Sequence, residues 1–359
     1  MSPAPIRQDI RYCTARDGAR IAIASIGSGP PLLRALHWLS HIEFDTESPV
    51  WRHWLRELSS GRRYIRYDQR GCGLSDWSPP AINFDAWVDD LEAVVETLGL
   101  RRFPLFGMSQ GGALAVAYAV RHPERVSRLV LFGAYARGKL RRDDAEQKKE
   151  AKLECDLMRI GWGRDNPAFR QMFTTQFIPG GTREQHDWYN DLERICTTPE
   201  NAARIIETSY SIEVADLAAA VRMPIIVFHA QHDVRVPFEE GKRLAALIPS
   251  ARFVPLDSGN HVLKENEPAW PKFLAEMRGF LAEDAETASS PPLGGASLTP
   301  SEQEVLALLV KGLDNTAIAS ALGKSEKTVR NQISSIYDKL GVRTRAEAIV
   351  RIRDTDLSA

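Results

Sequence analysis

Residues 103–112, with the sequence FPLFGMSQGG, decide the fold of this 359-residue chain. Residues 103–106 have the apolar character of a buried strand, and the apolar run at 113–120 has the length of a helix. Between the two lies the pattern G-x-S-x-G, in which small residues flank Ser109 and allow a sharp strand-to-helix turn to close. Such a turn strains the serine backbone and exposes the hydroxyl. The segment therefore predicts that Ser109 is a nucleophile.

A serine hydroxyl needs a base to activate it, and the base needs an acid to orient it. Asp233 follows the apolar run at 225–229, and His261 follows the apolar run at 253–256. Both runs are expected to be strands, so the loops after them should lie at the same edge of one sheet as Ser109. The order Ser109, Asp233, His261 is the one that this arrangement imposes. We therefore predict these three residues as a catalytic triad.

Other interpretations of these side chains stay open from the sequence. Asp233 alone could cap a helix, and His261 alone could be an ordinary buried histidine. Asp257 is a second candidate for the acid. His229 and His232 precede the acid in the chain, which makes them poorer candidates for the base.

Short apolar runs alternate with longer amphipathic segments, which is the order expected for an α/β fold with a doubly wound, mostly parallel sheet. The predicted strands are residues 20–26, 32–36, 64–67, 103–106, 129–132, 225–229 and 253–256. Asp17-Gly18 indicates a hairpin, so the first strands should be antiparallel. Residues 136–215 are helical in texture and rich in aromatic residues, and we interpret them as an inserted helical cap. Most of these aromatic side chains would only pack the cap, and the others favour a small apolar ligand.

Residues from about 10 to 282 resemble the α/β-hydrolase fold, with the cap between the sixth strand and the strand that carries the acid. The resemblance implies an oxyanion hole built from the backbone N–H of Gln110 and one N–H from the loop after residues 32–36. Many relatives have His-Gly in that loop, where this chain has His37-Trp38. By position Leu39 should donate the second N–H, and Trp38 in place of glycine could shift that role.

Two further features place the chain within this fold. Residues 67–75, YDQRGCGLS, resemble the D-x-R-G-x-G-x-S turn of the family, in which Asp68 and Arg70 would brace loops without taking part in chemistry. A serine at position 109 argues against the dehalogenase and epoxide hydrolase branches, which use an aspartate. Cleavage of an ester, lactone, thioester or carbon–carbon bond stays open.

Residues 284–297 are rich in Ala, Ser, Gly and Pro and are typical of a linker, which divides the chain into residues 1–283 and 298–359. After the linker, Thr299 and Glu302 form a capping box, a strong signal for the start of a helix. Gly323 ends a second short helix, and Ser325 caps a third. Two short helices joined by a tight turn are typical of a helix-turn-helix module.

Residues from about 298 to 353 resemble the LuxR/NarL-type DNA-binding domain. The residues that carry the resemblance are Leu298, Thr299, Glu302, Glu304, Val305, Leu306, Gly312, Ile318, Ala319, Leu322, Ser325, Thr328, Val329, Lys339, Leu340, Gly341, Val342 and Arg345. Two positions depart from the family pattern. Ser301 replaces an arginine, which removes a bracing ion pair, and Gln332 replaces a histidine of the recognition helix.

The local charge supports binding to DNA. Residues 324–353 contain eight cations and three acids, in a chain whose net charge is −1. On the third helix Arg330 and Asn331 are the candidates for reading bases, with Ser334 on the same face. Lys327, Thr328 and Lys339 are the candidates for phosphate contacts. The alternatives are a solvated helix face, or a helical module that serves only dimerisation.

Composition excludes several other classes of protein. Lys plus Arg number 46 against 47 Asp plus Glu, so the chain as a whole has no bias toward polyanions. The four cysteines form no C-x-x-C pair, no metal-ligand spacing is visible, and no organic cofactor is implied. The sequence shows no signal peptide and no apolar run of membrane-spanning length. We therefore expect a cytoplasmic protein that does not bind membranes.

The domain combination leads to one principal hypothesis: a transcriptional regulator whose α/β-hydrolase-like domain binds, and can hydrolyse, a small ester- or lactone-like ligand. Such regulators bind two-fold operators, so a homodimer is expected. The alternative is a working serine hydrolase whose helix-turn-helix tail serves dimerisation or localisation. Coupling between pocket occupancy and operator affinity would separate the two hypotheses.

Overall fold

The computed structural model describes residues 6–289, 298–340, 344, 345 and 348, and for residues 283–289 and 338–340 it describes the backbone only. The chain divides into two compact units, Met1–Leu281 and Ala282–Ala359. Each unit is considered by itself below.

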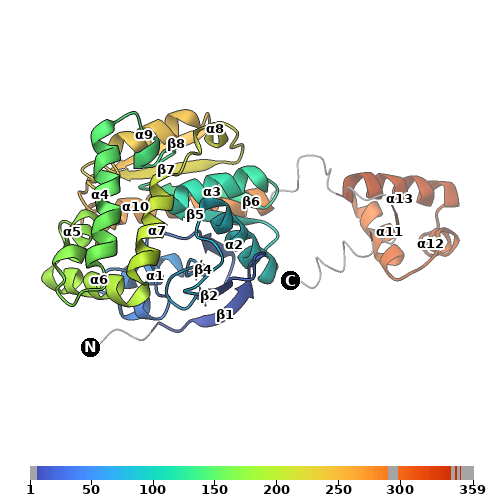
Figure 1. Ribbon diagram of the computed structural model, residues 1–359. Coiled ribbons are helices and arrows are strands. Elements are labelled where there is room, and N and C mark those ends of the chain that lie inside the picture. Colours follow the sequence, from blue (N-terminus) through green and yellow to red (C-terminus); the bar gives the residue numbers. More distant parts are fainter. Residues whose placement is uncertain (1–5, 290–297, 341–343, 346–347, 349–359) are drawn as a thin grey trace. The chain divides into compact units, whose positions relative to one another are not determined.

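The first unit is built on an eight-stranded sheet with the order β1-β2-β4-β3-β5-β6-β7-β8 (Figure 1). The strands are β1 (Asp9–Thr14), β2 (Arg20–Ile26), β3 (Pro31–Arg34), β4 (Arg63–Tyr67), β5 (Phe103–Met108), β6 (Val126–Phe132), β7 (Ile225–Ala230) and β8 (Ala251–Leu256). β2 pairs antiparallel with β1 and β4, and every other pairing is parallel. The predicted doubly wound, mostly parallel sheet and its N-terminal hairpin are confirmed.

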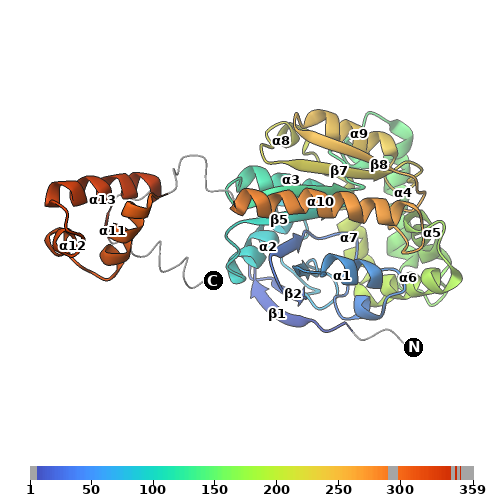
Figure 2. The ribbon, with the colours of Figure 1, turned by 180° about the vertical axis from the view of Figure 1, so that it is seen from behind.

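Helices cover both faces of this sheet. α2 (Phe84–Thr97) and α3 (Gln110–Arg121) lie on one face, and α1 (Arg52–Leu58) and α10 (Ala269–Ser289) lie on the other (Figures 1 and 2). Trp54 of α1 packs between Phe132 of β6 and Phe273 of α10, with ring centroids 5.5 and 5.1 Å away. Buried aromatic area of this kind is a large part of what stabilises the fold.

The chain leaves the sheet between β6 and β7 and forms the helices of the cap. These are η2 (Lys139–Arg141), α4 (Ala145–Gly161), α5 (Ala168–Phe177), α6 (Arg183–Cys196), α7 (Pro199–Tyr210) and α8 (Ala215–Ala218). The side chains of Asp144, Thr182 and Thr198 cap α4, α6 and α7, so local sequence determines where these helices begin. The cap precedes α9 (Phe238–Leu247), which follows β7 in the chain.

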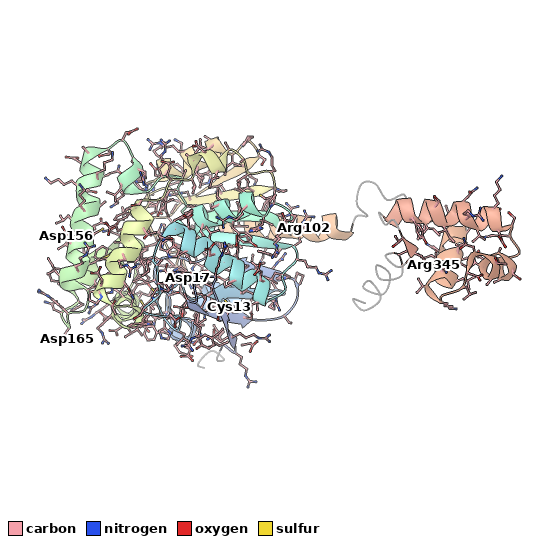
Figure 3. The ribbon with its side chains drawn as sticks, turned by 45° about the vertical axis from the view of Figure 1, so that its right-hand side comes forward. Cys13, Asp17, Arg102, Asp156, Asp165 and Arg345 are labelled. Carbon is pink, nitrogen blue, oxygen red and sulfur yellow. The ribbon has the colours of Figure 1, made fainter. Side chains whose placement is uncertain are left out.

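The second unit contains α11 (Pro300–Val310), α12 (Asn315–Leu322) and α13 (Glu326–Leu340), packed around their own apolar core. The predicted capping box forms, because Thr299 accepts from the Glu302 N–H and Glu302 accepts from the Thr299 N–H. Gly323 adopts φ 61° at the end of α12, the left-handed conformation that favours glycine. Arg345, labelled in Figure 3, donates to the carbonyls of Leu309 in α11 and of Leu313, which follows α11.

Two expectations for the C-terminal half differ from the structure or fall outside it. α10 continues to Ser289, so the first six residues of the predicted linker, 284–289, are helical. Their two alanines and Glu286 favour helix over coil, which the linker-like composition of the whole segment concealed. Residues 345–352, which the sequence indicates as a fourth helix of this unit, lie largely outside the described residues. No helix in the described residues has both the length and the apolar character needed to cross a membrane.

His53 on α1 makes the stability of the first unit depend on pH in the acid range. It is buried, its Nε2–H donates to the Leu263 carbonyl at 2.9 Å, and burial lowers its pKa from 6.5 to about 4. The unfolded chain takes up a proton near pH 6.5, whereas the folded chain does not until about pH 4. The stability that this difference contributes is present above pH 6.5 and is lost as the pH falls toward 4, by at most about 3 kcal/mol.

We therefore expect His53→Gln to flatten the loss of thermal stability over that pH range, measured by unfolding at successive pH values. Glutamine keeps a donor for the Leu263 carbonyl but does not titrate. His232→Gln is the matched control, because His232 is exposed and its replacement should leave the slope unchanged. Parallel curves for wild type and His53→Gln would contradict the assignment.

Candidate active site and DNA-binding surface

Ser109 occupies the turn between β5 and α3, as the sequence predicts. Its φ of 54° is the single positive φ of a non-glycine residue in the described part of the chain, and its ψ is −128°. The Ser109 N–H donates to the Phe132 carbonyl of the neighbouring strand β6 at 2.9 Å. Because this conformation is costly for a residue with a Cβ, the surrounding sheet must hold it.

The glycines around Ser109 are required by close approach of neighbouring segments. A Cβ on Gly107 would lie 2.6 Å from the Gly111 carbonyl oxygen, and a Cβ on Gly111 would overlap the Leu36 carbonyl oxygen. A Cβ on Gly112 would overlap the side chain of Ala134. The loop after β3 therefore lies directly against the N-terminus of α3, the place predicted for the second oxyanion donor.

His261 and Asp233 come together at the ends of β8 and β7. The Asp233 Oδ2 accepts from His261 Nδ1 at 2.6 Å, and the Asp233 Oδ1 accepts from the backbone N–H groups of Arg235 and Val236 at 2.8 and 3.0 Å. All of these groups are buried. Asp233 thus fixes the orientation of the His261 ring through Nδ1 and leaves the other ring nitrogen, Nε2, outside this contact.

His261 Nε2 is buried and has no hydrogen-bond partner among the described residues. His261 and Ser109 line one small pocket together with Trp38, Phe177 and other side chains. Catalytic hydrogen bonds are often long before substrate binds and shorten in the complex. His261 Nε2 can therefore accept a proton from a hydroxyl in this pocket.

The other candidates for base and acid lie in different surroundings. His229 is fully buried, its Nε2–H donates to the Val236 carbonyl at 2.8 Å, and burial lowers its pKa. Its Nε2 lies 3.8 Å from Asp233 Oδ2, which is too far for a hydrogen bond. These surroundings are those of a neutral structural histidine. His232 and Asp257 are exposed.

The candidate oxyanion donors lie on both sides of Ser109. Gln110 is the first residue of α3, so its backbone N–H has no acceptor within the helix. Trp38 lines the pocket with Ser109, and Leu39 is buried one residue further along the loop. The His37 ring hydrogen-bonds with the Trp38 carbonyl and holds this loop.

Asp68 and Arg70 brace the loops around the site. Asp68 accepts from the Ser40 hydroxyl at 2.7 Å and from the Leu74 N–H at 2.9 Å, joining the loop after β3 to the loop after β4. Arg70 donates to Asp90 at 2.7 and 2.9 Å and to Asp17 at 2.6 Å. Both side chains are fully buried, and both have the structural role predicted for them.

Some cap aromatics reach the site and others do not. Phe177 and Tyr189 line the pocket that contains His261, whereas Trp162 and Phe173 pack against each other with ring centroids 5.6 Å apart. The sequence did not indicate a second pocket at Ser109, lined by Lys139, Arg142 and Arg235. These cations come from separate segments and carry no common motif, so no pattern in the chain could have grouped them.

The candidate DNA-contacting residues lie along the exposed side of α13. Lys327, Arg330, Asn331 and Ser334 are exposed, as is Thr328, while Val329, Ile333 and Ile336 are buried in the core. The Thr328 hydroxyl also lies 2.8 Å from the Ser325 hydroxyl, within the cap of the helix. The side chain of Lys339 lies outside the described residues.

The two departures from the family pattern contact each other. The Ser301 hydroxyl accepts from Gln332 Nε2 at 2.8 Å and from Lys324 Nζ at 2.6 Å. Gln332 therefore braces α13 against α11 and does not belong to the exposed side of α13. Ser301 is thus the centre of a polar cluster that joins α11 to Lys324 and to α13.

Comparison with known proteins agrees with both folds. Residues 44–268 match the alpha/beta hydrolase fold model, and residues 296–352 match the model for bacterial regulatory proteins of the luxR family. A pyrrolizixenacetamide deacetylase from Xenorhabdus hominickii is 27% identical over 271 residues, which cover 74% of this chain and 96% of that protein.

Solved structures show the same fold. An esterase from Exiguobacterium antarcticum has a TM-score of 0.65 at 23% identity and covers 76% of this chain and 98% of its own. An enol-lactonase from Burkholderia xenovorans LB400 has a TM-score of 0.63 at 21% identity and covers 76% of this chain and 100% of its own. The class is thus an α/β hydrolase joined to a regulatory helix-turn-helix domain. The chain belongs to the α/β-hydrolase fold family and carries a LuxR-family DNA-binding domain at residues 296–352.

Proposed function

We propose that this protein is a cytoplasmic, homodimeric transcriptional regulator whose hydrolase domain binds and hydrolyses a small ester- or lactone-like ligand. Ser109 is the nucleophile, His261 the base, and Asp233 the acid that orients the base. The observation that carries the proposal is the 2.6 Å contact between His261 and Asp233, with His261 Nε2 in the pocket of the strained Ser109 and without a hydrogen-bond partner in the part of the chain that the structure describes. The similar proteins described above include a deacetylase, an esterase and an enol-lactonase, which supports acyl-group chemistry.

In the proposed reaction, His261 Nε2 takes the proton of the Ser109 hydroxyl as the serine Oγ attacks the substrate carbonyl. The oxyanion accepts hydrogen bonds from the Gln110 N–H and from an N–H of Trp38 or Leu39. Collapse breaks the bond to the leaving alcohol, which takes the proton from His261. Water then attacks the acyl-serine with His261 again as the base, releasing the acid and restoring Ser109.

On the DNA side, the exposed face of α13 is proposed to enter the major groove. Arg330 and Asn331 would contact base edges, with Ser334 beside them, and Lys327 would contact phosphate. Thr328 and Lys339 are proposed as further phosphate contacts. Two copies of the chain would occupy the half-sites of a two-fold operator, because one such module buries little surface on DNA.

Coupling between the two domains tests the proposal. A duplex is first selected from a random library with the full-length protein, and its Kd is then measured before and after labelling with a fluorophosphonate. For a regulator we expect labelling to change the Kd severalfold, while the Ser109→Ala variant, which cannot be labelled at this position, keeps its Kd after the same treatment. Active hydrolysis with an unchanged Kd would favour the alternative, a hydrolase whose tail only localises or dimerises it.

Arg330→Ala should weaken binding to the selected duplex by roughly 1–3 kcal/mol, because a bidentate contact to a base would be lost. Binding to a scrambled duplex should change little, and the two affinities would be compared by gel-shift titration. Lys311→Ala is the matched control, since it removes an exposed cation at the end of α11 instead of α13. An equal loss on both duplexes would make Arg330 a phosphate contact.

A further inference from the structure

The second pocket beside Ser109 has an unusual charge. Lys139, Arg142 and Arg235 line it together with Ser109, and none of the described residues that line it carries a carboxylate. Tyr135 and Tyr210 complete much of its wall. The nucleophile therefore lies against a pocket whose ionisable lining is cationic.

Two of these cations are almost excluded from water, since Arg142 is 7% exposed and Arg235 is 8% exposed. Taking a guanidinium out of water is costly unless anions or hydrogen-bond acceptors replace the solvent. Arg142 has partial compensation: it donates to the Arg137 carbonyl at 3.0 Å and to Gln147 at 2.9 Å. The acceptors of Arg235 include Gln176 at 2.9 Å.

Two carboxylates behind the pocket wall are shared among the cations. Glu154 lies 2.9 Å from Lys139 and 3.5 Å from Arg235, and it also accepts from the Tyr210 hydroxyl. Glu240 lies 3.5 Å from Arg142 and 2.6 Å from Arg243 of its own helix. The exposed Glu150 also lies 3.9 Å from Lys139. The three pocket cations and Arg243 are therefore four cations that face three carboxylates. A positive excess remains at the pocket.

Ser109 lies where this cationic pocket meets the apolar one. On the other side of the serine are Trp38, Phe177 and Val262. The free volume of the cationic pocket is about 20 Å³, which suits a small charged group and not a whole ligand. A substrate whose carbonyl is at Ser109 would thus have an apolar part on one side and a small anionic group on the other.

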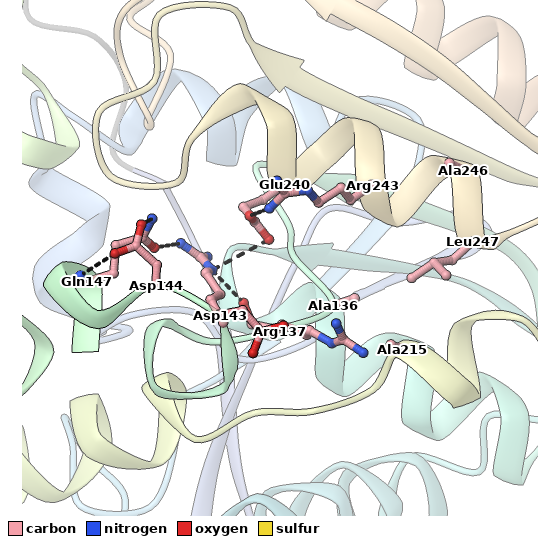
Figure 4. Close-up of a pocket in the computed structure, with 11 residues that line it drawn as sticks. Ala136, Arg137, Asp143, Asp144, Gln147, Ala215, Glu240, Arg243, Ala246 and Leu247 are labelled. Atoms are coloured by element: carbon pink, nitrogen blue, oxygen red, sulfur yellow. Dashed lines mark hydrogen bonds and ion pairs between the residues drawn. The ribbon is translucent and has the colours of Figure 1, made fainter.

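Arg142 also lines a larger cavity of about 540 Å³ on its far side. Figure 4 shows Glu240, Arg243 and Leu247 of α9 along one side of this cavity, and Asp144 and Gln147 at the start of α4 along another. Its lining mixes acids and bases, so the preference for an anion belongs to the inner pocket alone.

We infer that the substrate carries a carboxylate, and that Arg142, Arg235 and Lys139 hold this carboxylate while its ester or lactone carbonyl lies at Ser109. The inference rests on the proposed function and refines its ligand from a purely apolar molecule to an amphipathic monoanion. Guanidinium groups suit this task, because charge-assisted hydrogen bonds to a carboxylate are stronger than neutral ones. These three side chains are specificity determinants and take no part in proton transfer.

A matched pair of esters tests the inference: the mono-4-nitrophenyl ester of glutaric acid, and 4-nitrophenyl pentanoate, which has the same chain length without the carboxylate. We expect the wild type to favour the glutarate ester in kcat/KM by roughly 10- to 100-fold, the value of one or two charge-assisted hydrogen bonds. Arg142→Met should bring this ratio close to one. Glu240 would still have Arg243 as a partner, so the variant leaves no buried carboxylate unpaired.

Two further variants complete the test. Lys139→Met should also lower the ratio, and it replaces Arg142→Met if that variant does not fold, because Glu154 would keep Arg235 and Tyr210. Arg137→Met is the control, since Arg137 lines the outer cavity and not the inner pocket, and it should keep the wild-type ratio.

The outcomes separate this inference from the proposed function. Ser109-dependent hydrolysis of both esters without a preference for the glutarate ester would overturn the carboxylate inference and leave the hydrolase in place. If neither ester is hydrolysed, the hydrolytic part of the proposed function fails, and calorimetry with glutaric acid monoanilide and N-phenylpentanamide then decides. Tighter binding of the anionic anilide, lost in Arg142→Met, would support the inference, and equal binding would overturn it.

Discussion

Ser109→Ala is expected to abolish covalent labelling by a fluorophosphonate and to lower kcat for 4-nitrophenyl pentanoate by about 10⁴- to 10⁶-fold, the range that loss of a triad serine gives in other hydrolases. The attacking oxygen is removed, while the backbone donors around it stay. Intact mass of the labelled protein and steady-state kinetics would measure the two effects.

The same variant should keep its fold. The backbone of Ser109 holds the turn, because its N–H donates to the Phe132 carbonyl and its carbonyl accepts from the Gly112 N–H. Alanine preserves both contacts. Ser60→Ala is the matched control, because Ser60 is exposed and its loss should leave labelling unchanged. Hydrolysis at the wild-type rate by a folded Ser109→Ala variant would contradict the assignment of Ser109 as the nucleophile. A wild type that forms no adduct would favour a receptor that binds its ligand without covalent chemistry.

Asp233→Asn is expected to lower kcat by about 10⁴-fold with little change in fold, the effect that a wrong histidine tautomer has in other triads. The asparagine carbonyl can still accept from the N–H groups of Arg235 and Val236, which now bind Asp233 Oδ1. Its amide would then face His261 Nδ1 as a donor. His261 would carry its proton on Nε2 and could no longer take the proton of Ser109.

Asp257→Asn is the control for this change, because it removes the other carboxylate considered for the acid. Asp257 is exposed, and the contact to His261 is made by Asp233, so kcat should not change. Chemical shifts of the histidine ring nitrogens would report the tautomer directly. A full loss of activity in Asp257→Asn with an active Asp233→Asn would reverse the assignment of the acid.

The sequence predicts the three candidate catalytic residues because the patterns that mark them are local. Ser109 lies in a strand-turn-helix segment whose glycines are required within a few residues of it, and Asp233 and His261 lie in the loops that follow β7 and β8. The linker was less well predicted, because composition alone does not show that α10 persists to Ser289. The apolar ligand was inferred from aromatic content, which does not distinguish Phe173, packed against Trp162 in the cap, from Phe177, at the site.

The sequence by itself determined the α/β fold, the helix-turn-helix module and the order of the three candidate catalytic residues, because each depends on periodicity and turn chemistry over short stretches. Only the tertiary structure decided that Asp233 contacts His261 and that Gln332 contacts Ser301. It alone grouped Lys139, Arg142 and Arg235 around Ser109. The physical reason is that such contacts join segments far apart in the chain, and their energies depend on burial and distance, which packing sets.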